Sequence, residues 1–218
     1  MKKIAAFVIC LLAVSKLLAQ DCSQYVYLQK GKTIEMTTFD RGGQVMDKLV
    51  NFVTDVSTSN GTTTATVSSE SFDKNGHSEG KTNALYKCTG GAFLIDINAN
   101  RPQTTGGKFS TTYVEYPANM HVGEHLNDVT TQLQMKMGSR TVNMTTKITN
   151  RMVADKESVT TPAGTWDAFK ITYTTTITMD QSTGMGTRTT ETAQWYVPNF
   201  GIVQILAFGM TIKLTSIH

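Results

Sequence analysis

One short stretch of the sequence contains residue types that commonly bind metals. His121, Glu124 and His125 form the pattern H-x-x-E-H, which some zinc-dependent hydrolases carry on a helix. On a helix, residues four apart share a face, so both imidazoles would reach one metal ion. In an extended strand, positions 121 and 125 would lie roughly 13 Å apart, too far to share a zinc ion. Whether these weak metal-ligand candidates can act together therefore depends on local structure.

The neighbouring residues favour a turn over a helix at this motif. Pro117 precedes it, Gly123 interrupts it, and threonine-rich segments follow. The sequence also lacks the G-x-S-x-G motif of serine hydrolases, phosphate-binding loops and dinucleotide fingerprints. We therefore expect a protein that is not an enzyme and needs no cofactor. A metal-dependent hydrolase using His121, Glu124 and His125 is the less favoured alternative.

A second set of residues is suited to apolar ligands. Methionine side chains are unbranched and adapt to irregular apolar surfaces, and tryptophans can grip lipids or sugars. The candidate ligand-binding residues are Met135, Met137, Met144, Met179, Trp166 and Trp195. Ordinary core packing is the competing interpretation for all six.

The elements that must position these residues are predicted to be strands. The clearest is 169–179, where Phe169, Ile171 and Tyr173 alternate with Lys170, Thr172 and further threonines. A period of two places the apolar residues on one buried face and the others in water. The chain contains 36 threonines, and these β-branched residues favour strands over helices. No segment shows a convincing helical stripe.

Pairs such as Gly42-Gly43, Asn60-Gly61 and Asn75-Gly76 separate the strand-like segments and are typical of hairpin turns. We therefore predict an all-β fold of long antiparallel strands that form a strongly curved sheet or incomplete barrel. A two-sheet β-sandwich is the alternative. The apolar pattern is interrupted over 98–112, where two similar halves of a single domain, 21–218, would meet.

The first twenty residues have the features of a signal peptide. Lys2 and Lys3 are followed by the apolar stretch Ile4–Val14, and Ala19 is a small residue near the expected cleavage point. We therefore expect export to the periplasm or the extracellular space. No later apolar stretch is long enough to be a transmembrane segment.

Removal of residues 1–20 would change both the charge and the cysteine content. The formal net charge of +3 would fall by the three lysines Lys2, Lys3 and Lys16, and 3 minus 3 is zero. The mature chain therefore has no charge excess that would favour nucleic acid as a partner. Of three cysteines, Cys22 and Cys88 would remain, and we predict a disulfide between them over the alternative of two free thiols.

Three segments resemble a family of exported bacterial proteins called TapB-like, which is grouped with domains of unknown function. They are 161–171 (TPAGTWDAFKI), 195–203 (WYVPNFGIV) and 122–128 (VGEHLND). The resemblance covers most of the mature chain and implies an envelope location. It supplies no catalytic residues, and it implies that His121 and His125 belong to a turn before a strand.

Two non-catalytic functions remain open on the sequence alone. The first is binding of an apolar ligand or a lipoprotein-like partner on the curved sheet, which predicts a cavity of a few hundred cubic ångströms. The second is a structural or surface-interaction module that contacts protein or glycan, which predicts an exposed apolar patch and no cavity.

Overall fold

The computed structural model describes residues 22–98, 108–109, 111–137, 140–180, 184 and 186–218. Two 3-10 helices, η1 (Cys22–Gln24) and η2 (Val26–Leu28), precede the strands. The strands are β1 (Thr33–Phe39), β2 (Val45–Ser59), β3 (Thr62–Asp73), β4 (Ser78–Thr89), β5 (Ala92–Asp96), β6 (Lys108–Phe109), β7 (Tyr113–Tyr116), β8 (Val129–Met137), β9 (Arg140–Thr161), β10 (Gly164–Met179), β11 (Thr187–Val197), β12 (Gly201–Ala207) and β13 (Met210–Ile217).

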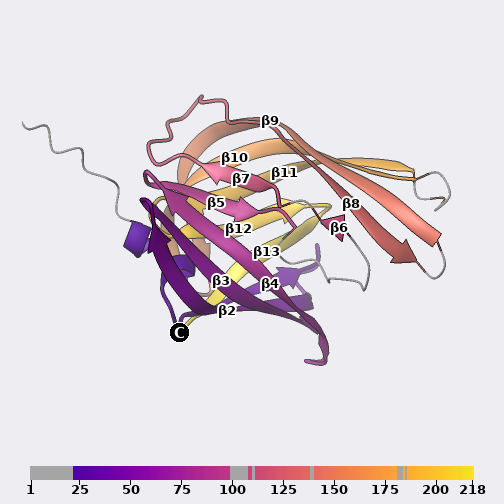
Figure 1. Ribbon diagram of the computed structural model, residues 1–218, viewed down its shortest axis with the longest axis horizontal. Coiled ribbons are helices and arrows are strands. Elements are labelled where there is room, and N and C mark those ends of the chain that lie inside the picture. The colour runs from indigo at the N-terminus through magenta and orange to yellow at the C-terminus, as the bar shows by residue number, and fades with distance from the viewer. Residues whose placement is uncertain (1–21, 99–107, 110, 138–139, 181–183, 185) are drawn as a thin grey trace, which may run out of the picture.

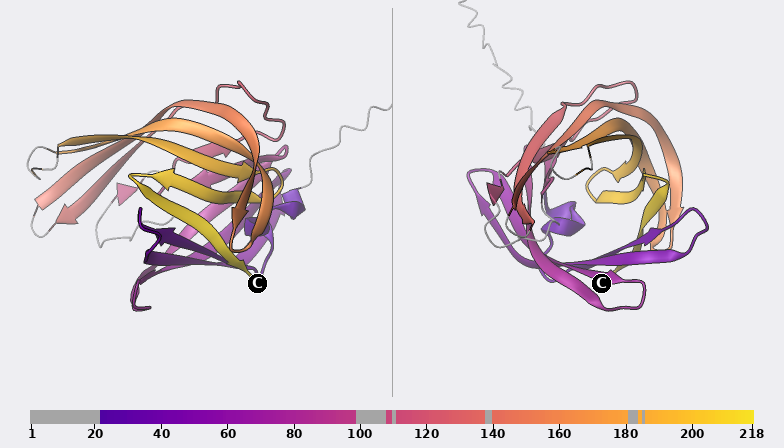
Figure 2. Two further views of the ribbon diagram at one scale, coloured as in Figure 1. Left: turned by 180° about the vertical axis from the view of Figure 1, so that it is seen from behind. Right: turned by 90° about the vertical axis from the view of Figure 1, so that its right-hand side faces the viewer.

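All thirteen strands belong to one antiparallel sheet, in the order β6-β8-β9-β10-β11-β12-β13-β1-β2-β3-β4-β5-β7. The chain ends meet in the middle of this order, because β13 pairs with β1. The sheet curls round on itself (Figures 1 and 2), and no ladder of hydrogen bonds joins its end strands β6 and β7. The predicted curved sheet or incomplete barrel is thus confirmed, and the sandwich alternative is wrong.

The predicted alternation in β10 is seen where the strand crosses the core. Phe169 and Ile171 are buried, and Ile171 is fully inaccessible. Beyond Tyr173 no residue of β10 is buried, because the hairpins β8–β9 and β10–β11 project from one end of the barrel (Figure 1). Threonines pair across β10 and β11 in this region, with hydroxyl separations of 3.2 Å for both Thr176–Thr189 and Thr178–Thr187.

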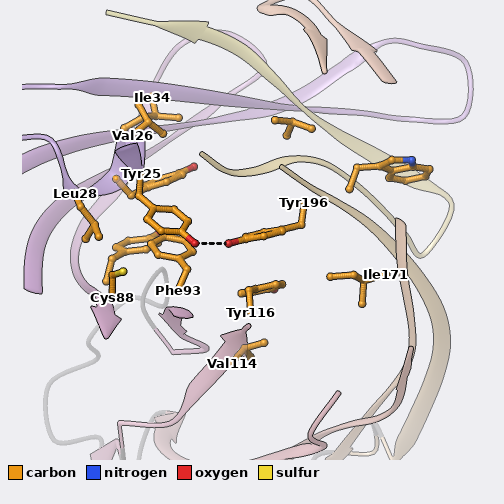
Figure 3. Packing of buried hydrophobic residues seen from close by; sticks show 14 of the residues in the cluster. Tyr25, Val26, Leu28, Ile34, Cys88, Phe93, Val114, Tyr116, Ile171 and Tyr196 are labelled. Atoms are coloured by element: carbon orange, nitrogen blue, oxygen red, sulfur yellow. Dashed lines mark hydrogen bonds between the residues drawn. The ribbon is translucent and has the colours of Figure 1, made fainter. Parts of the chain in front are cut away.

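The opposite end of the barrel is filled by the N-terminal segment Tyr25–Leu28, whose four residues are all buried. Tyr25 stacks on Phe93 with ring centroids 4.5 Å apart, and Tyr27 stacks on Tyr86 at 4.7 Å. The Tyr196 hydroxyl donates to the Tyr25 hydroxyl at 3.0 Å, as Figure 3 shows. We call Cys22–Leu28 together with these aromatic partners the plug.

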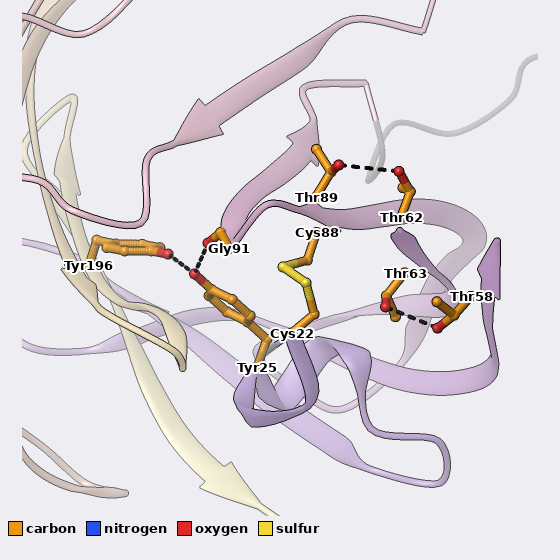
Figure 4. The surroundings of a disulfide bond; sticks show 9 residues. All are labelled: Cys22, Tyr25, Thr58, Thr62, Thr63, Cys88, Thr89, Gly91 and Tyr196. Carbon is orange, nitrogen blue, oxygen red and sulfur yellow. Dashed lines mark hydrogen bonds between the residues drawn. A yellow bond between two sulfur atoms is a disulfide. The ribbon is translucent and has the colours of Figure 1, made fainter. Parts of the chain in front are cut away.

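A disulfide fixes the plug to β4. Cys22 and Cys88 are joined with a Cα–Cα separation of 5.7 Å, and the bond closes a loop with a sequence separation of 66 (Figure 4). Tyr25 adds a hydrogen bond of 3.0 Å to the Gly91 carbonyl on the same side. The predicted disulfide is confirmed, and together with this hydrogen bond it holds the buried segment Tyr25–Leu28 against β4 and β5.

The predicted signal peptide, 1–20, lies outside the described residues, as does most of the predicted connection, 98–112. Within the part of the chain that the structure describes, no helix is both long and apolar enough to cross a bilayer.

Candidate functional site

The curved sheet surrounds a cavity of about 490 Å³ between the plug and the projecting hairpins. Eleven strands and η2 contribute side chains to its lining, so the cavity lies inside the barrel. The lining is mainly aliphatic and tyrosine side chains, among them Met36, Leu49, Val114, Ile148, Tyr173 and Ile212. A volume of this size lies within the range of small-molecule sites in proteins, roughly 300–1,000 Å³.

Arg151 is the only cationic side chain among the described residues that line this cavity. It is 1% exposed and is among the largest fully buried side chains described. Its Nη1 donates to the Asn127 carbonyl at 2.8 Å, and its Nη2 donates to the Glu115 carbonyl at 3.0 Å. Both acceptors are neutral. No ion pair among the described residues involves Arg151, so its charge is buried without a carboxylate partner.

A bulge in β9 turns Arg151 inward. Val142, Met144, Thr146 and Ile148 are buried at even positions, whereas Arg151 and Val153, the next buried residues, are at odd positions. The register with β10 shifts at this point, because Thr172 pairs with Met152 and Thr174 with Thr149. Asn150 adopts a positive φ of 56°, a conformation that asparagine tolerates better than most residues. An extra residue of this kind re-aims the side chains that follow it.

The H-x-x-E-H segment supports this bulge. The Gly123 amide donates to the Val153 backbone carbonyl at 2.8 Å, and the Leu126 amide donates to the Arg151 backbone carbonyl at 2.9 Å. The segment therefore runs beside β9. The Glu124 carboxylate lies 3.0 Å from the His121 Nδ1 and accepts the His121 backbone amide, also at 3.0 Å. The segment is therefore a turn, as the resemblance implied.

His125 forms an isolated bridge with Met152 and does not join the His121–Glu124 pair. Among the described residues, no three His, Cys, Asp or Glu side chains are grouped closely enough to hold a metal ion. In the described geometry, the segment that contains His121, Glu124 and His125 forms backbone contacts with β9 next to Arg151.

Tyrosines connect the cavity to the plug. The Arg151 guanidinium lies 5.5 Å from the ring centre of Tyr116, whose hydroxyl donates to Gln194 at 2.8 Å. The Tyr116 ring stacks on Tyr196 at 4.7 Å, and Tyr196 bonds to Tyr25 in the plug (Figure 3). Burial raises the pKa of Tyr116 and Tyr196 above the ordinary value of 10.0, so both phenols remain neutral hydrogen-bond donors.

The cavity lining also contains two carboxylates, Asp47 and Asp96. Asp47 accepts a 2.6 Å hydrogen bond from Thr38, and Asp96 accepts the Asn98 and Thr112 backbone amides at 3.0 and 3.4 Å. Both carboxylates are therefore bonded to neutral donors within the fold, as Arg151 is bonded to neutral acceptors, and none of the three forms an ion pair among the described residues.

The residues predicted to bind a ligand lie elsewhere. Trp166 packs on Phe200 and bonds to Thr161 at 3.1 Å, and Trp195 bonds to Glu157 at 2.7 Å. Neither tryptophan lines the cavity, and neither do Met144 and Met179 in the projecting hairpins. The side chains of Met135 and Met137 lie outside the described residues. Sequence reasoning did not single out Arg151, Gln194 or the cavity tyrosines.

The fold and its interior define a class of all-β proteins in which one strongly curved sheet encloses an apolar cavity. Within that class, the model of the DUF3108-like family matches residues 29–217. The chain therefore belongs to the DUF3108-like family. No curated protein matches the chain.

Two solved structures have the same fold. A protein from Parabacteroides distasonis, provisionally described as a lipoprotein, is 20% identical, with a TM-score of 0.75 over 91% of this chain and 100% of that one. A protein from Bacteroides fragilis, provisionally described as exported and with a YmcC-like fold, is 19% identical, with a TM-score of 0.71 over 87% of this chain and 96% of that one. At these identities the likeness concerns the fold alone.

Proposed function

We propose that this chain is a non-catalytic exported protein that binds an apolar ligand in the cavity of its curved sheet. The observation that carries the proposal is the cavity of about 490 Å³ with its mainly aliphatic and aromatic lining. A void of this size costs stability, because its lining residues lose the contacts that a filled core would provide. Retention of such a void favours a binding role over a purely structural one.

The export part of the proposal has independent support. The N-terminal sequence has the charge, apolar stretch and small residue of a signal peptide. The disulfide between Cys22 and Cys88 is suited to an oxidising compartment. The descriptions of the two structural neighbours as a lipoprotein and an exported protein agree with this location. Within the DUF3108-like family, we assign the chain to the TapB-like group on the three segments named above.

The non-catalytic part rests on the geometry of the enzyme-like motif. His121 and Glu124 pair with each other in an exposed turn, and the His125 backbone forms a separate bridge with Met152. The surface-interaction alternative accounts for the exposed large apolar side chains but gives no account of the cavity, so it gains less support.

Binding of a neutral fluorophore tests the proposal. The purified protein should bind 1-aminoanthracene saturably at one site per chain. Val114→Phe, which places a larger ring in the cavity, should weaken binding about tenfold or more. Val45→Phe, at a 46% exposed position on β2, is the matched control and should leave binding unchanged. Circular dichroism checks that both variants are folded.

Absence of saturable binding by the unmodified protein would contradict the proposal, as would equal binding by both variants. Native mass spectrometry of protein isolated from its own cell envelope provides a second measurement. A co-purifying apolar molecule that is absent from the Val114→Phe variant is the expected result.

A further inference from the structure

Resting on the proposed function, we infer that the ligand is an amphiphile with one anionic head group, and that Arg151 binds this head. The inference starts from a buried charge. Arg151 is 1% exposed, lines the cavity and forms no ion pair among the described residues. A cation removed from water is strongly disfavoured unless an anion or several hydrogen-bond acceptors compensate it.

The compensation seen in the fold is partial. A guanidinium has five N–H groups in a planar fork. Two backbone carbonyls, those of Asn127 and Glu115, accept from Nη1 and Nη2. The Tyr116 side chain is a further hydrogen-bond partner, and its ring centre lies 5.5 Å from the guanidinium carbon. The remaining N–H groups lie on a side chain that faces the cavity. A carboxylate or phosphate group is the acceptor that this fork matches best, because two of its oxygens can accept two parallel hydrogen bonds from the guanidinium.

The fold holds Arg151 in place on three sides. The Asn150 bulge aims its side chain inward, the Leu126 amide fixes its carbonyl, and the Asn127 carbonyl fixes one end of its guanidinium. A long flexible side chain used only to fill space would not require this support. Positioning of a binding group by a rigid surrounding shell is typical of a preorganised site.

The two carboxylates in the lining do not take the place of the ligand anion. Asp47 is bonded to Thr38, and Asp96 accepts two backbone amides. The mainly apolar remainder of the lining suits a single hydrocarbon chain.

Isothermal titration calorimetry with three probes tests the inference: dodecanoate, 1-dodecanol and acetate. We expect dodecanoate to bind on the order of ten- to a hundredfold tighter than 1-dodecanol, because hydrogen bonds to a charged group carry this difference. Acetate should not compete at equal concentration, because it lacks the apolar chain.

Arg151→Met should remove the preference for dodecanoate while leaving the affinity for 1-dodecanol unchanged. Arg151→Lys should retain part of the preference, because it keeps the charge but not the fork. Lys147→Met removes one positive charge from an exposed position on the same strand and should preserve the preference fully. If Arg151→Met fails to fold, the ratio of the affinities for dodecanoate and 1-dodecanol, measured for the unmodified protein and for Arg151→Lys, still tests the inference.

Equal binding of dodecanoate and 1-dodecanol by the unmodified protein would overturn this inference and leave the proposed function standing. Competition by acetate at equal concentration would overturn it in favour of a small-anion site. Failure of both twelve-carbon probes to bind would count against the proposed function itself.

Discussion

The plug and the cavity lie inside the same barrel but are constructed in opposite ways. In the plug, four consecutive residues are buried, aromatic rings stack in contact, and a disulfide ties the segment to β4. Around the cavity of about 490 Å³ the lining side chains do not close on one another, and Arg151 is buried there without an ion pair among the described residues. The difference indicates that one end of the barrel is closely packed and cross-linked, whereas the other is more loosely packed around a buried charge.

The largest effect we expect is unfolding at alkaline pH, in which the plug and the cavity region unfold together. Burial raises the pKa of five tyrosines in or near them above the ordinary value of 10.0: Tyr25, Tyr27, Tyr116, Tyr173 and Tyr196. Below pH 10 these phenols are protonated in both folded and unfolded chains, so their contribution to stability is fully present. Above pH 10 the unfolded chain releases protons that the folded chain retains, so stability falls as pH rises.

Circular dichroism and tyrosinate absorbance followed against pH should therefore show loss of the fold and phenol ionisation in one transition above pH 10. Tyrosinate formation for all seven tyrosines while the sheet signal persists would contradict the buried placement of these rings.

Removal of the disulfide should weaken the plug selectively. A loop with a separation of 66 residues gives about 4 kcal/mol of stabilisation in the chain-entropy model. The double variant C22S/C88S should lose about this amount in guanidinium unfolding. A reducing agent should lower the stability of the unmodified protein to the same level and leave the variant unaffected. An unchanged unfolding midpoint in the variant would show that the aromatic stacks alone hold the plug.

A matched pair of isoleucines measures the difference between the two regions directly. Ile34 is fully inaccessible and belongs to the buried cluster that includes the plug residues Tyr25–Leu28 (Figure 3), whereas Ile148 lines the cavity. Ile34→Ala should cost about 4 kcal/mol and Ile148→Ala about 2 kcal/mol, because a side chain beside an existing void has fewer contacts to lose. Equal costs from urea unfolding would mean that the cavity lining is packed as tightly as the plug.

The projecting hairpin provides the baseline, with the smallest effect. Thr176 and Thr189 form an exposed pair across β10 and β11. Thr176→Ala should cost about 0.5 kcal/mol in the free energy of unfolding, the usual size for a cross-strand pair on a wet face. Thr176→Val, which keeps the β-branched shape, should recover most of the loss. A loss in the free energy of unfolding larger than that of Ile148→Ala would show that this hairpin is as important for stability as the core.

Alternation of residue type and the turn pairs were sufficient to predict the curved antiparallel sheet, because both are local patterns. The disulfide was predicted from the even number of cysteines that remain after residue 20. Alternation was not sufficient for Arg151. The even-numbered apolar positions Val142, Met144 and Ile148 imply an outward Arg151, and the bulge at Asn150 reverses this. The signal was present as an asparagine between Ile148 and Val153, apolar residues of opposite parity.

Among the described residues, those predicted to bind a ligand are not the ones that line the cavity. Trp166 and Trp195 were chosen for their residue type, yet each packs against its own neighbourhood away from the cavity. The cavity is lined by side chains from eleven strands, so its presence depends on how the whole sheet packs and cannot be predicted from any one segment. Its tyrosines come from separate strands and η2, so only the folded chain brings them together.

The shortness of the two end strands affects how the protein behaves at high concentration. An open sheet offers unpaired backbone groups at its ends, and other chains can add to them and aggregate. Here β6 has two residues and β7 has four, and the Glu115 carbonyl on β7 is occupied by Arg151. Arg151 therefore also occupies a backbone acceptor on an end strand of the sheet, so its loss should promote self-association of the protein.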